Sequence, residues 1–268
     1  MAERPLSIAD LAQRKRAGQK LVVLTCYDAL FARLLEAAGV DLLLVGDSLN
    51  QVLGGRPSTL SATLDQMIYH AGSVRRGAAR TPIMVDLPFL SYQVSIEEAI
   101  RNAGRVLAET DCHAVKLEGG EPMAATVRAL VDRGIPVVGH LGLTPQSINV
   151  LGGYRVQGRD DPTAKRLLSD ARALQDAGAS AIVLELLPRT LAADISAALA
   201  IPTIGIGAGN GCDGQVLVLH DMLGLNEEFT PKFLKHFGSL GVAVREAVAQ
   251  YGAEVRSGAY PDASHSFD

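Results

Sequence analysis

Short runs rich in valine, isoleucine and leucine alternate along the chain with longer segments of mixed apolar and polar residues. The runs occupy residues 21–27, 41–47, 82–88, 113–120, 135–141, 179–188, 201–209 and 215–223. Continuous apolar runs indicate strands buried on both faces, as in parallel sheets, and the mixed segments between them are typical of amphipathic helices. The pattern therefore predicts a series of strand–helix units that ends with the strands at 201–209 and 215–223, eight strands in all.

A repeated unit and the chain length favour a closed barrel. The segments EAAGVDLLLVGD, ETDCHAVKLEGG and DAGASAIVLELL share a helix end, a turn, an apolar strand and an acidic terminus. A length of 268 residues is usual for one (β/α)₈ barrel. The alternative is a doubly wound open sheet, but such a sheet concentrates its site at one switch point. We therefore predict an α/β fold, a TIM barrel, with residues 1–268 as a single domain. A short helix precedes the barrel, and a tail loses its periodicity after about residue 256.

Composition narrows the classes of partner. The net charge is −4 and the sequence pI is about 5.9, so nucleic acid and anionic membranes are not expected to bind. No apolar stretch reaches the roughly 20 residues of a membrane span, and the amino terminus lacks the apolar centre of a signal peptide. Cys26, Cys112 and Cys212 form no CxxC pair, which predicts reduced thiols and a cytoplasmic location.

Five of the predicted strands carry charged or metal-capable side chains near their carboxyl ends. These side chains are Asp47, Asp86, Lys116, Glu118, His140 and Glu185. A charge in an apolar run is unfavourable unless it is paired, binds a metal or faces a cleft. The carboxyl ends of barrel strands form the face that carries the active site. The pattern therefore predicts an enzyme.

Asp47 and Asp86 belong to neighbouring strands, so a barrel can bring their carboxylates together. Two close carboxylates repel unless a cation or a proton lies between them. Few, carboxylate-rich ligands suit Mg²⁺, which keeps waters and takes further ligands from substrate. The structural alternative is that each aspartate caps a helix or joins a loop ion pair. The spacing alone is not a specific metal motif.

Lys116 and Glu118 lie two residues apart, so both point into the barrel. They form either a structural ion pair or a functional pair, in which Glu118 holds a metal-bound water and Lys116 binds a substrate oxyanion. The residues alone leave both interpretations open.

His140 and Glu185 also end apolar strands. A lone histidine is most often a hydrogen-bonded core residue, but its strand-end position favours a function. Burial raises the pKa of a carboxyl group, which suits Glu185 to act as a general base, whereas its structural alternative is a pair with a basic residue. The glycine-rich GIGAGNGCDGQ fits no phosphate-binding motif and is interpreted as mainly structural.

Several long motifs resemble the ketopantoate hydroxymethyltransferase family. They are VGDSL, VDLPF, VKLEGG, GHLGLTPQS, GGYRVQGR, IGIGAGNGCDGQ and SGAYPDASHSF, and the likeness runs from about Leu6 to Ser266. The resemblance implies a barrel of the phosphoenolpyruvate/pyruvate superfamily. It also implies hydroxymethyl transfer from 5,10-methylenetetrahydrofolate to 3-methyl-2-oxobutanoate through a Mg²⁺-stabilised enolate. The product would be 2-dehydropantoate, in pantothenate biosynthesis.

The resemblance also implies roles for single residues. Asp47, Asp86 and Glu118 would hold one Mg²⁺ per subunit, with Glu118 reaching it directly or through water. The substrate would be bound by Asp47, Ser48, Asp86, Lys116 and His140. Glu185 would be the catalytic base, and Tyr27 would line the pocket. Tail helices would pack across subunits of a homo-oligomer, a decamer.

This chain departs from the family pattern after VGDSL, where Asn50 stands in place of the usual glycine and LGGRPSTLSAT is a looser match. The resemblance implies that this loop borders the site, where it would contribute to closure and to folate contacts.

Two competing functions stay open. A Mg²⁺-dependent C–C lyase of the same superfamily would share the ketoacid site and differ only in lacking folate dependence. A catalytically silent barrel that serves binding or assembly is disfavoured, because buried charges are costly to retain without use. The motifs favour the transferase.

Overall fold

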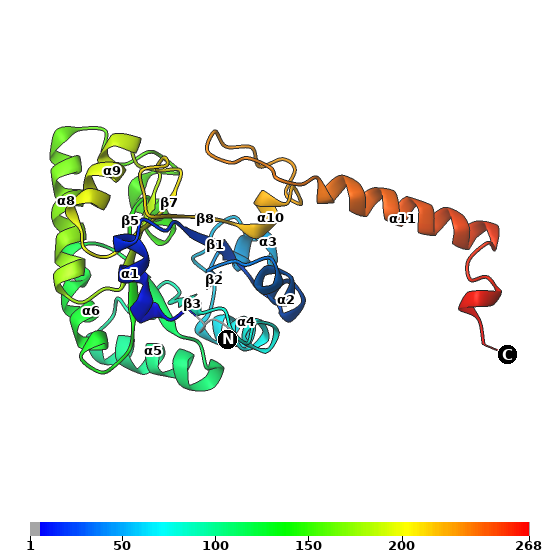
Figure 1. Cartoon of the computed structure of the whole chain (residues 1–268), viewed down its shortest axis with the longest axis horizontal. Coiled ribbons are helices and arrows are strands. Elements are labelled where there is room, and N and C mark those ends of the chain that lie inside the picture. Colours follow the sequence, from blue (N-terminus) through cyan, green and yellow to red (C-terminus); the bar gives the residue numbers. More distant parts are fainter. Residues whose placement is uncertain (1–5, 268) are drawn as a thin grey trace. The chain divides into compact units, whose positions relative to one another are not determined.

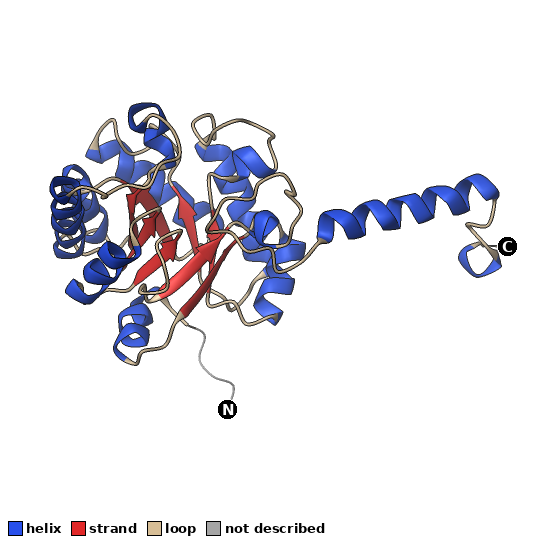
Figure 2. Cartoon of the chain, turned by 90° about the horizontal axis from the view of Figure 1, so that it is seen from above, coloured by secondary structure: helices blue, strands red, loops and turns tan. Residues whose placement is uncertain are grey.

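The computed structural model describes residues 6–267, and these fall into two compact units that divide between Val218 and Leu219. In the first unit, eight parallel strands form a closed barrel in chain order, with β8 paired to β1. Helices surround these strands (Figures 1 and 2). The strands are β1 Leu21–Thr25, β2 Leu42–Val45, β3 Ile83–Asp86, β4 Ala114–Glu118, β5 Val137–Gly142, β6 Ala181–Glu185, β7 Thr203–Ile206 and β8 Gly214–Leu217. The predicted (β/α)₈ barrel is confirmed.

In the first unit, one α-helix precedes β1 and the other α-helices lie between β1 and β7, while the described segment from β7 to β8 contains no helix. These α-helices are α1 Leu11–Arg16, α2 Ala29–Ala37, α3 Leu49–Val52, α4 Leu64–Gly77, α5 Ile96–Thr110, α6 Ala124–Val131, α7 Ile148–Leu151, α8 Asp161–Asp176 and α9 Arg189–Ala198. Short 3₁₀ helices cover Ile8–Asp10, Glu121–Met123 and Pro145–Ser147. Side-chain caps start several of the helices: Asp28 accepts from Leu30 N at 2.8 Å, and Thr63 and Gln66 form a reciprocal capping box.

The second unit contains α10 Leu219–Met222, α11 Leu240–Ser257 and a 3₁₀ helix at Ala263–His265. Helix α11 ends where the sequence loses its periodicity. The expectation of a strand over 215–223 is wrong in extent, because β8 stops at Leu217 and α10 follows. Apolar letters alone do not separate a strand end from a short helix.

The sequence-based assignment of residues 1–268 to a single domain stays a prediction, and residues 1–5 and 268 lie outside the described residues. Over residues 6–267, no helix is long and apolar enough to cross a membrane.

The barrel interior is apolar at one end. Its buried cluster takes side chains from the inward faces of the strands, among them Met84, Ala114, Val138 and Val183. Leu11 of α1 joins the same cluster. Every second residue of a strand points to the same side, so the next inward positions are set by this core.

Candidate active site

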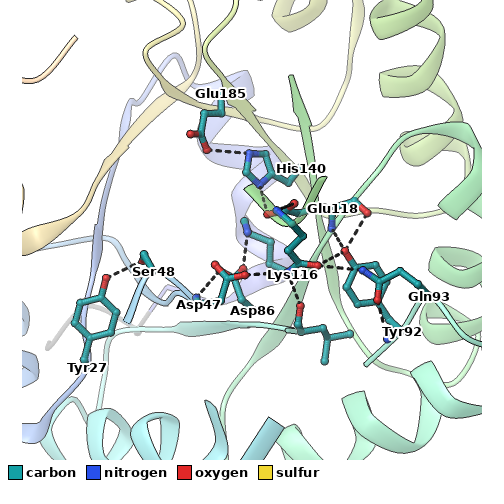
Figure 3. Close-up of polar contacts among 12 residues, drawn as sticks. Tyr27, Asp47, Ser48, Asp86, Tyr92, Gln93, Lys116, Glu118, His140 and Glu185 are labelled. Atoms are coloured by element: carbon teal, nitrogen blue, oxygen red, sulfur yellow. Dashed lines mark hydrogen bonds and ion pairs between the residues drawn. The ribbon is translucent and has the colours of Figure 1, made fainter. Parts of the chain in front are cut away.

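The inward face of four strands changes from apolar to polar within one two-residue step. Met84, Ala114, Val138 and Val183 belong to the buried core, and two residues after each of them stand, in the same order, Asp86, Lys116, His140 and Glu185. Glu118 lies one further step along β4, and Asp47 lies just after β2. The strand period therefore delivers these side chains to the carboxyl-terminal mouth of the barrel, where Figure 3 shows them converging.

Asp86 lies at the centre of a first group of charged side chains, which also contains Asp47, Lys116 and Glu118. Its Oδ1 accepts from Lys116 Nζ at 2.5 Å, and its Oδ2 accepts from the backbone N–H of Asp47 at 3.0 Å. The Lys116 and Asp86 side chains are each 4% exposed. Gly46 allows this approach, because a Cβ there would lie 2.8 Å from Ser48 Oγ and 3.5 Å from Asp86 Oδ2.

The first group is short of positive charge. Burial, and then the negative charges of Asp86 and Glu118, raise the pKa of Asp47 well above its usual value. Burial opposes the charge on Lys116, but Asp86, Glu118 and Asp47 outweigh it and raise the pKa of the lysine. Lys116 and His140 therefore face four carboxylates, those of Asp47, Asp86, Glu118 and Glu185, and an added cation stabilises this excess of negative charge.

His140 lies between two acids. Its Nδ1 is 3.5 Å from Glu118 Oε1 and its Nε2 is 3.2 Å from Glu185 Oε2, although neither contact has the alignment of a hydrogen bond. Burial and Lys116 disfavour protonation, but Glu118 and Glu185 outweigh them and raise the pKa of His140 to about 9. The imidazole lies between the two carboxylates, and their negative charge favours its protonated form (Figure 3).

Ser48 and Tyr27 form a further edge of the mouth. The Tyr27 hydroxyl lies 2.8 Å from Ser48 Oγ, and Tyr27 follows the end of β1 (Figure 3). The structure therefore places Ser48 of the motif VGDSL next to Tyr27, the residue that was expected to line the pocket.

Two buried residues at the mouth were not singled out in the sequence. Gln146, just after β5, contacts both Asp47 and Glu118, and Tyr92, in the β3–α5 loop, contacts the Glu118 backbone. Gln146 belongs to the motif GHLGLTPQS, so the sequence did point to its neighbourhood as functional. Tyr92 belongs to none of the quoted motifs, so nothing in the sequence pointed to it.

The donor set can be tested against Mg²⁺. Over residues 6–267, no three His, Cys, Asp or Glu side chains are already arranged as a metal cage. Mg²⁺ does not need one, because it is held by one or two carboxylates together with waters and substrate oxygens. Asp47, Asp86 and Glu118 are hard oxygen donors with a local excess of negative charge. The residues therefore fit the cation, while their role as ligands stays a prediction.

Asn50 holds the loop that follows α3. Its buried amide donates to Ser58 O at 2.7 Å and to Ser61 Oγ at 2.9 Å. Its carbonyl accepts from Arg56 N at 3.0 Å. The loop that follows α3 is thus fastened to Asn50.

A cavity of about 780 Å³ lies beside the rim of β4 and β5. Gly119, Gly120, Leu141 and Gly142 line one side and Arg166 of α8 lines the other. The predicted site residues do not line it, although Gly119 directly follows Glu118.

The structure brings together all seven predicted site residues at one end of the barrel, and none is placed elsewhere. They are Asp47, Ser48, Asp86, Lys116, Glu118, His140 and Glu185. Their proximity is a structural fact, and their individual roles stay predictions.

Known proteins share this chain's sequence and fold. The family model for ketopantoate hydroxymethyltransferase matches residues 5–263. A 3-methyl-2-oxobutanoate hydroxymethyltransferase of Desulfotalea psychrophila is 52% identical over 97% of this chain and 94% of that protein. The enzyme of the same name from Syntrophus aciditrophicus is 52% identical over 98% and 97%.

Solved structures share the fold at low identity. A 2,3-dimethylmalate lyase, a member of the PEP mutase/isocitrate lyase superfamily, has a TM-score of 0.60 and 19% identity, covering 94% of this chain and 89% of that one. A phosphonopyruvate hydrolase in complex with oxalate and Mg²⁺ has a TM-score of 0.64 and 12% identity, covering 97% and 93%.

Proposed function

The chain belongs to the ketopantoate hydroxymethyltransferase family, and from that premise we propose that it transfers a hydroxymethyl group from 5,10-methylenetetrahydrofolate to 3-methyl-2-oxobutanoate. The product is 2-dehydropantoate. The resemblance found in the sequence motifs is thereby confirmed at the level of the family. The observation that carries the proposal is the convergence of four acids, with Lys116 and His140, at the mouth of a barrel of this family.

Asp47, Asp86 and Glu118 are the proposed holders of Mg²⁺, with Glu118 acting directly or through water. Their shortage of positive charge supports this assignment. When bound, the cation supplies positive charge to the ketoacid carbonyl oxygen and makes the hydrogen on C3 more acidic. A phosphonopyruvate hydrolase with the same fold carries Mg²⁺ and oxalate in its solved structure.

The ketoacid oxygens need donors as well as a cation. Ser48 Oγ lies at the edge of the mouth beside Tyr27, and it is proposed to hold the substrate carboxylate together with nearby backbone amides. Lys116 and His140 are proposed to orient the remaining oxygens. Buried donors fixed before substrate arrives avoid reorganisation during the reaction.

Glu185 is the proposed base. It removes the proton from C3 of the ketoacid, and C3 then forms a C–C bond to the one-carbon unit of the folate. The bonds from that carbon to the two folate nitrogens break, water supplies the hydroxyl oxygen, and tetrahydrofolate leaves. His140 Nε2, 3.2 Å from Glu185 Oε2, holds the carboxylate in position for the proton transfer. The Glu185 side chain is 15% exposed, so a substrate can reach it from the mouth.

Deuterium exchange tests this assignment without the folate. Wild-type protein with Mg²⁺ should exchange the C3 hydrogen of 3-methyl-2-oxobutanoate in D₂O, as followed by proton NMR. Glu185→Gln should stop the exchange while the variant still binds the ketoacid. Exchange at the wild-type rate in the variant would assign the base to another residue.

Folate dependence separates the proposed transferase from a C–C lyase of the same superfamily. The assay measures ketoacid consumption with and without methylenetetrahydrofolate, each with and without Mg²⁺. The transferase requires both additions. Ketoacid formation from a 2-hydroxy or 2-methyl acid without folate would instead support the lyase.

We further propose that the protein is a homo-oligomer, a decamer as the family resemblance implies. Helix α11 leaves several large apolar side chains exposed, namely Val244, Val248, Tyr251 and Val255. Exposed apolar stripes of this kind are typical of protein–protein contacts. The mass in solution, measured by light scattering, tests the proposal, and a monomer mass at micromolar concentration would contradict it. A cytoplasmic location is consistent with three free cysteines and stays a prediction.

A further inference from the structure

We propose that Gln146 is the positioning residue of the proposed metal site, and that it sets the orientation of Asp47 and Glu118 together. The inference rests on the proposed function, because it concerns two of the residues assigned to Mg²⁺. Gln146 itself is not a candidate ligand. It acts on both acids through hydrogen bonds and is only 6% exposed.

Gln146 donates to each of the two acids. Its side-chain Nε2 donates to Asp47 Oδ2 at 2.9 Å, and its backbone N–H donates to Glu118 Oε2 at 2.9 Å. One residue therefore holds one oxygen of each carboxylate. Asp47 follows β2 and Glu118 ends β4, so Gln146 is a link between two strands that are not neighbours in the barrel.

The amide of Gln146 can take only one orientation. Its Nε2 also lies 2.9 Å from the carbonyl oxygen of Leu87, which can only accept a hydrogen bond. On the other side, Oε1 accepts from the Tyr92 hydroxyl at 2.8 Å and from Gln93 Nε2 at 3.1 Å. A flipped amide would set oxygen against oxygen at Leu87 and at Asp47.

Tyr92 holds the backbone of Glu118, while Gln146 holds its side chain. Its hydroxyl accepts from the backbone N–H of Glu118 at 3.0 Å and lies 3.2 Å from the Glu118 carbonyl oxygen (Figure 3). The end of β4 is thus fastened through its backbone by Tyr92 and through its side chain by Gln146. Both loops meet at the residue that ends the strand.

The chemistry of the link suits a cation site. A neutral amide donor stabilises the ionised form of a carboxylate without supplying a positive charge that would compete with a metal. Because Gln146 engages Oδ2 of Asp47 and Oε2 of Glu118, it directs Oδ1 and Oε1 of these acids away from the loop. Partners that orient metal ligands change metal affinity about 10- to 100-fold when they are removed.

Metal binding without turnover is the direct test. Mn²⁺ serves as the probe, and its free concentration is followed by electron paramagnetic resonance in the absence of ketoacid and folate. Gln146→Met keeps the size and removes the side-chain bonds, and it should weaken Mn²⁺ binding by about 10-fold or more. Gln146→Glu should weaken it further, because it places an acceptor against Asp47. Gln51→Met, the same change in a glutamine on the α3 side of the mouth, should bind Mn²⁺ as wild type does.

Tyr92→Phe is the second variant, and it keeps the aromatic ring while removing the hydroxyl. It should weaken Mn²⁺ binding by about 3- to 10-fold, a smaller loss than Gln146→Met, since the Gln146 bonds to both acids remain. A purely structural role would lower the melting temperature of these variants and leave the Mn²⁺ affinity of the folded protein unchanged.

The outcomes separate this inference from the proposed function. Affinities of Gln146→Met and Tyr92→Phe within twofold of wild type, or a wild-type protein that binds no Mn²⁺, would overturn the inference. A graded loss of affinity in a protein that fails to transfer a hydroxymethyl group would support the inference and overturn the proposed function. If Gln146→Met does not fold, the result for Tyr92→Phe decides.

Discussion

Two lysine–aspartate pairs lie at opposite ends of the same barrel, and their surroundings differ. Lys116 and Asp86 lie at the carboxyl-terminal mouth, with 2.5 Å between Nζ and Oδ1. Lys15 and Asp213 lie at the amino-terminal base, with 3.0 Å between Nζ and Oδ2. Both pairs join elements that are far apart in the chain. Only the surroundings of each pair show what it is for.

At the base, donors and acceptors are matched. Lys15 Nζ, besides Asp213, donates to Ser196 O at 2.5 Å and to Ile201 O at 3.0 Å. Asp213 Oδ2 also accepts from the backbone N–H of Thr203 at 2.9 Å. The cluster fastens α1 to α9 and to the starts of β7 and β8. Side chains at this end of a TIM barrel stabilise the fold.

At the mouth, the charges are not matched. The Lys116–Asp86 pair has two further carboxylates, Asp47 and Glu118, close enough to raise the pKa of Lys116. A protein evolved for stability alone would not keep such an excess of buried negative charge. An unbalanced buried cluster therefore marks a binding site, and a balanced one marks a structural joint.

The largest effect is expected when one aspartate of each kind is neutralised. Asp47→Asn should remove repulsion at the mouth, so the free energy of unfolding without divalent metal should rise by about 1 kcal/mol. Its transferase activity should fall by more than about 100-fold, since even removing a partner of a metal ligand costs 10- to 100-fold. Denaturant unfolding in EDTA and steady-state kinetics measure the two quantities.

Asp213→Asn is the matched change at the base. It should lower the free energy of unfolding by about 2 kcal/mol, because Lys15 and Thr203 lose a charged acceptor. Its activity per folded molecule should stay within twofold of wild type. Equal losses of stability in Asp47→Asn and Asp213→Asn would show that both clusters are structural joints.

A metal titration gives the next largest effect. A ligand that binds only the folded state at 100 times its dissociation constant adds about 2.7 kcal/mol of stability. Wild type and Lys15→Met should gain the same increment on addition of Mg²⁺, although Lys15→Met starts about 2 kcal/mol lower. Asp47→Asn should gain little. The unfolding free energy is measured at one fixed protein concentration.

A smaller Mg²⁺ increment in Lys15→Met than in wild type would contradict the separation of the two ends. It would mean that the joint at the base also shapes the mouth. Lys20, whose Nζ donates to Cys212 O at the same end, offers a second base variant, Lys20→Met, for which the full increment is again expected.

The sequence was enough to predict the barrel and the inward-facing acids, because both follow from the two-residue period of buried strands. The sequence itself shows that four polar residues each stand two positions after an apolar core residue. They are Asp86, Lys116, His140 and Glu185. The glycines of GIGAGNGCDGQ also fit their structural interpretation: a Cβ at Gly211 would lie 2.7 Å from Ala193 Cβ of α9.

The contacts of the loops could not be predicted in the same way. Tyr92 contacts Glu118 from the loop that follows β3. In this loop Leu90 has a φ of 65°, a left-handed conformation that leucine rarely adopts and that the sequence pattern does not indicate. Gln146 was visible in a motif, but its two acidic partners come from strands that only the closed barrel brings near it. Loop conformation depends on tertiary contacts, whereas strand alternation is local.

The smallest effect is expected at Asn50, which tests whether every residue near the mouth serves the site. Asn50 lies near the mouth, but its amide donors have acceptors, as the polar groups at the base do. Asn50→Gly should remove two partly buried hydrogen bonds of the side chain. It should raise the hydrogen-exchange rate of the Arg56 amide, which donates to Asn50 O, by about 5-fold, equivalent to about 1 kcal/mol of local stability. Gln51→Gly carries the same backbone change with more exposed contacts and should have a smaller effect. Mn²⁺ affinity should be unchanged in both variants. If Asn50→Gly instead weakened metal binding as much as Asp47→Asn, charge balance would no longer distinguish a structural residue from a functional one at the mouth.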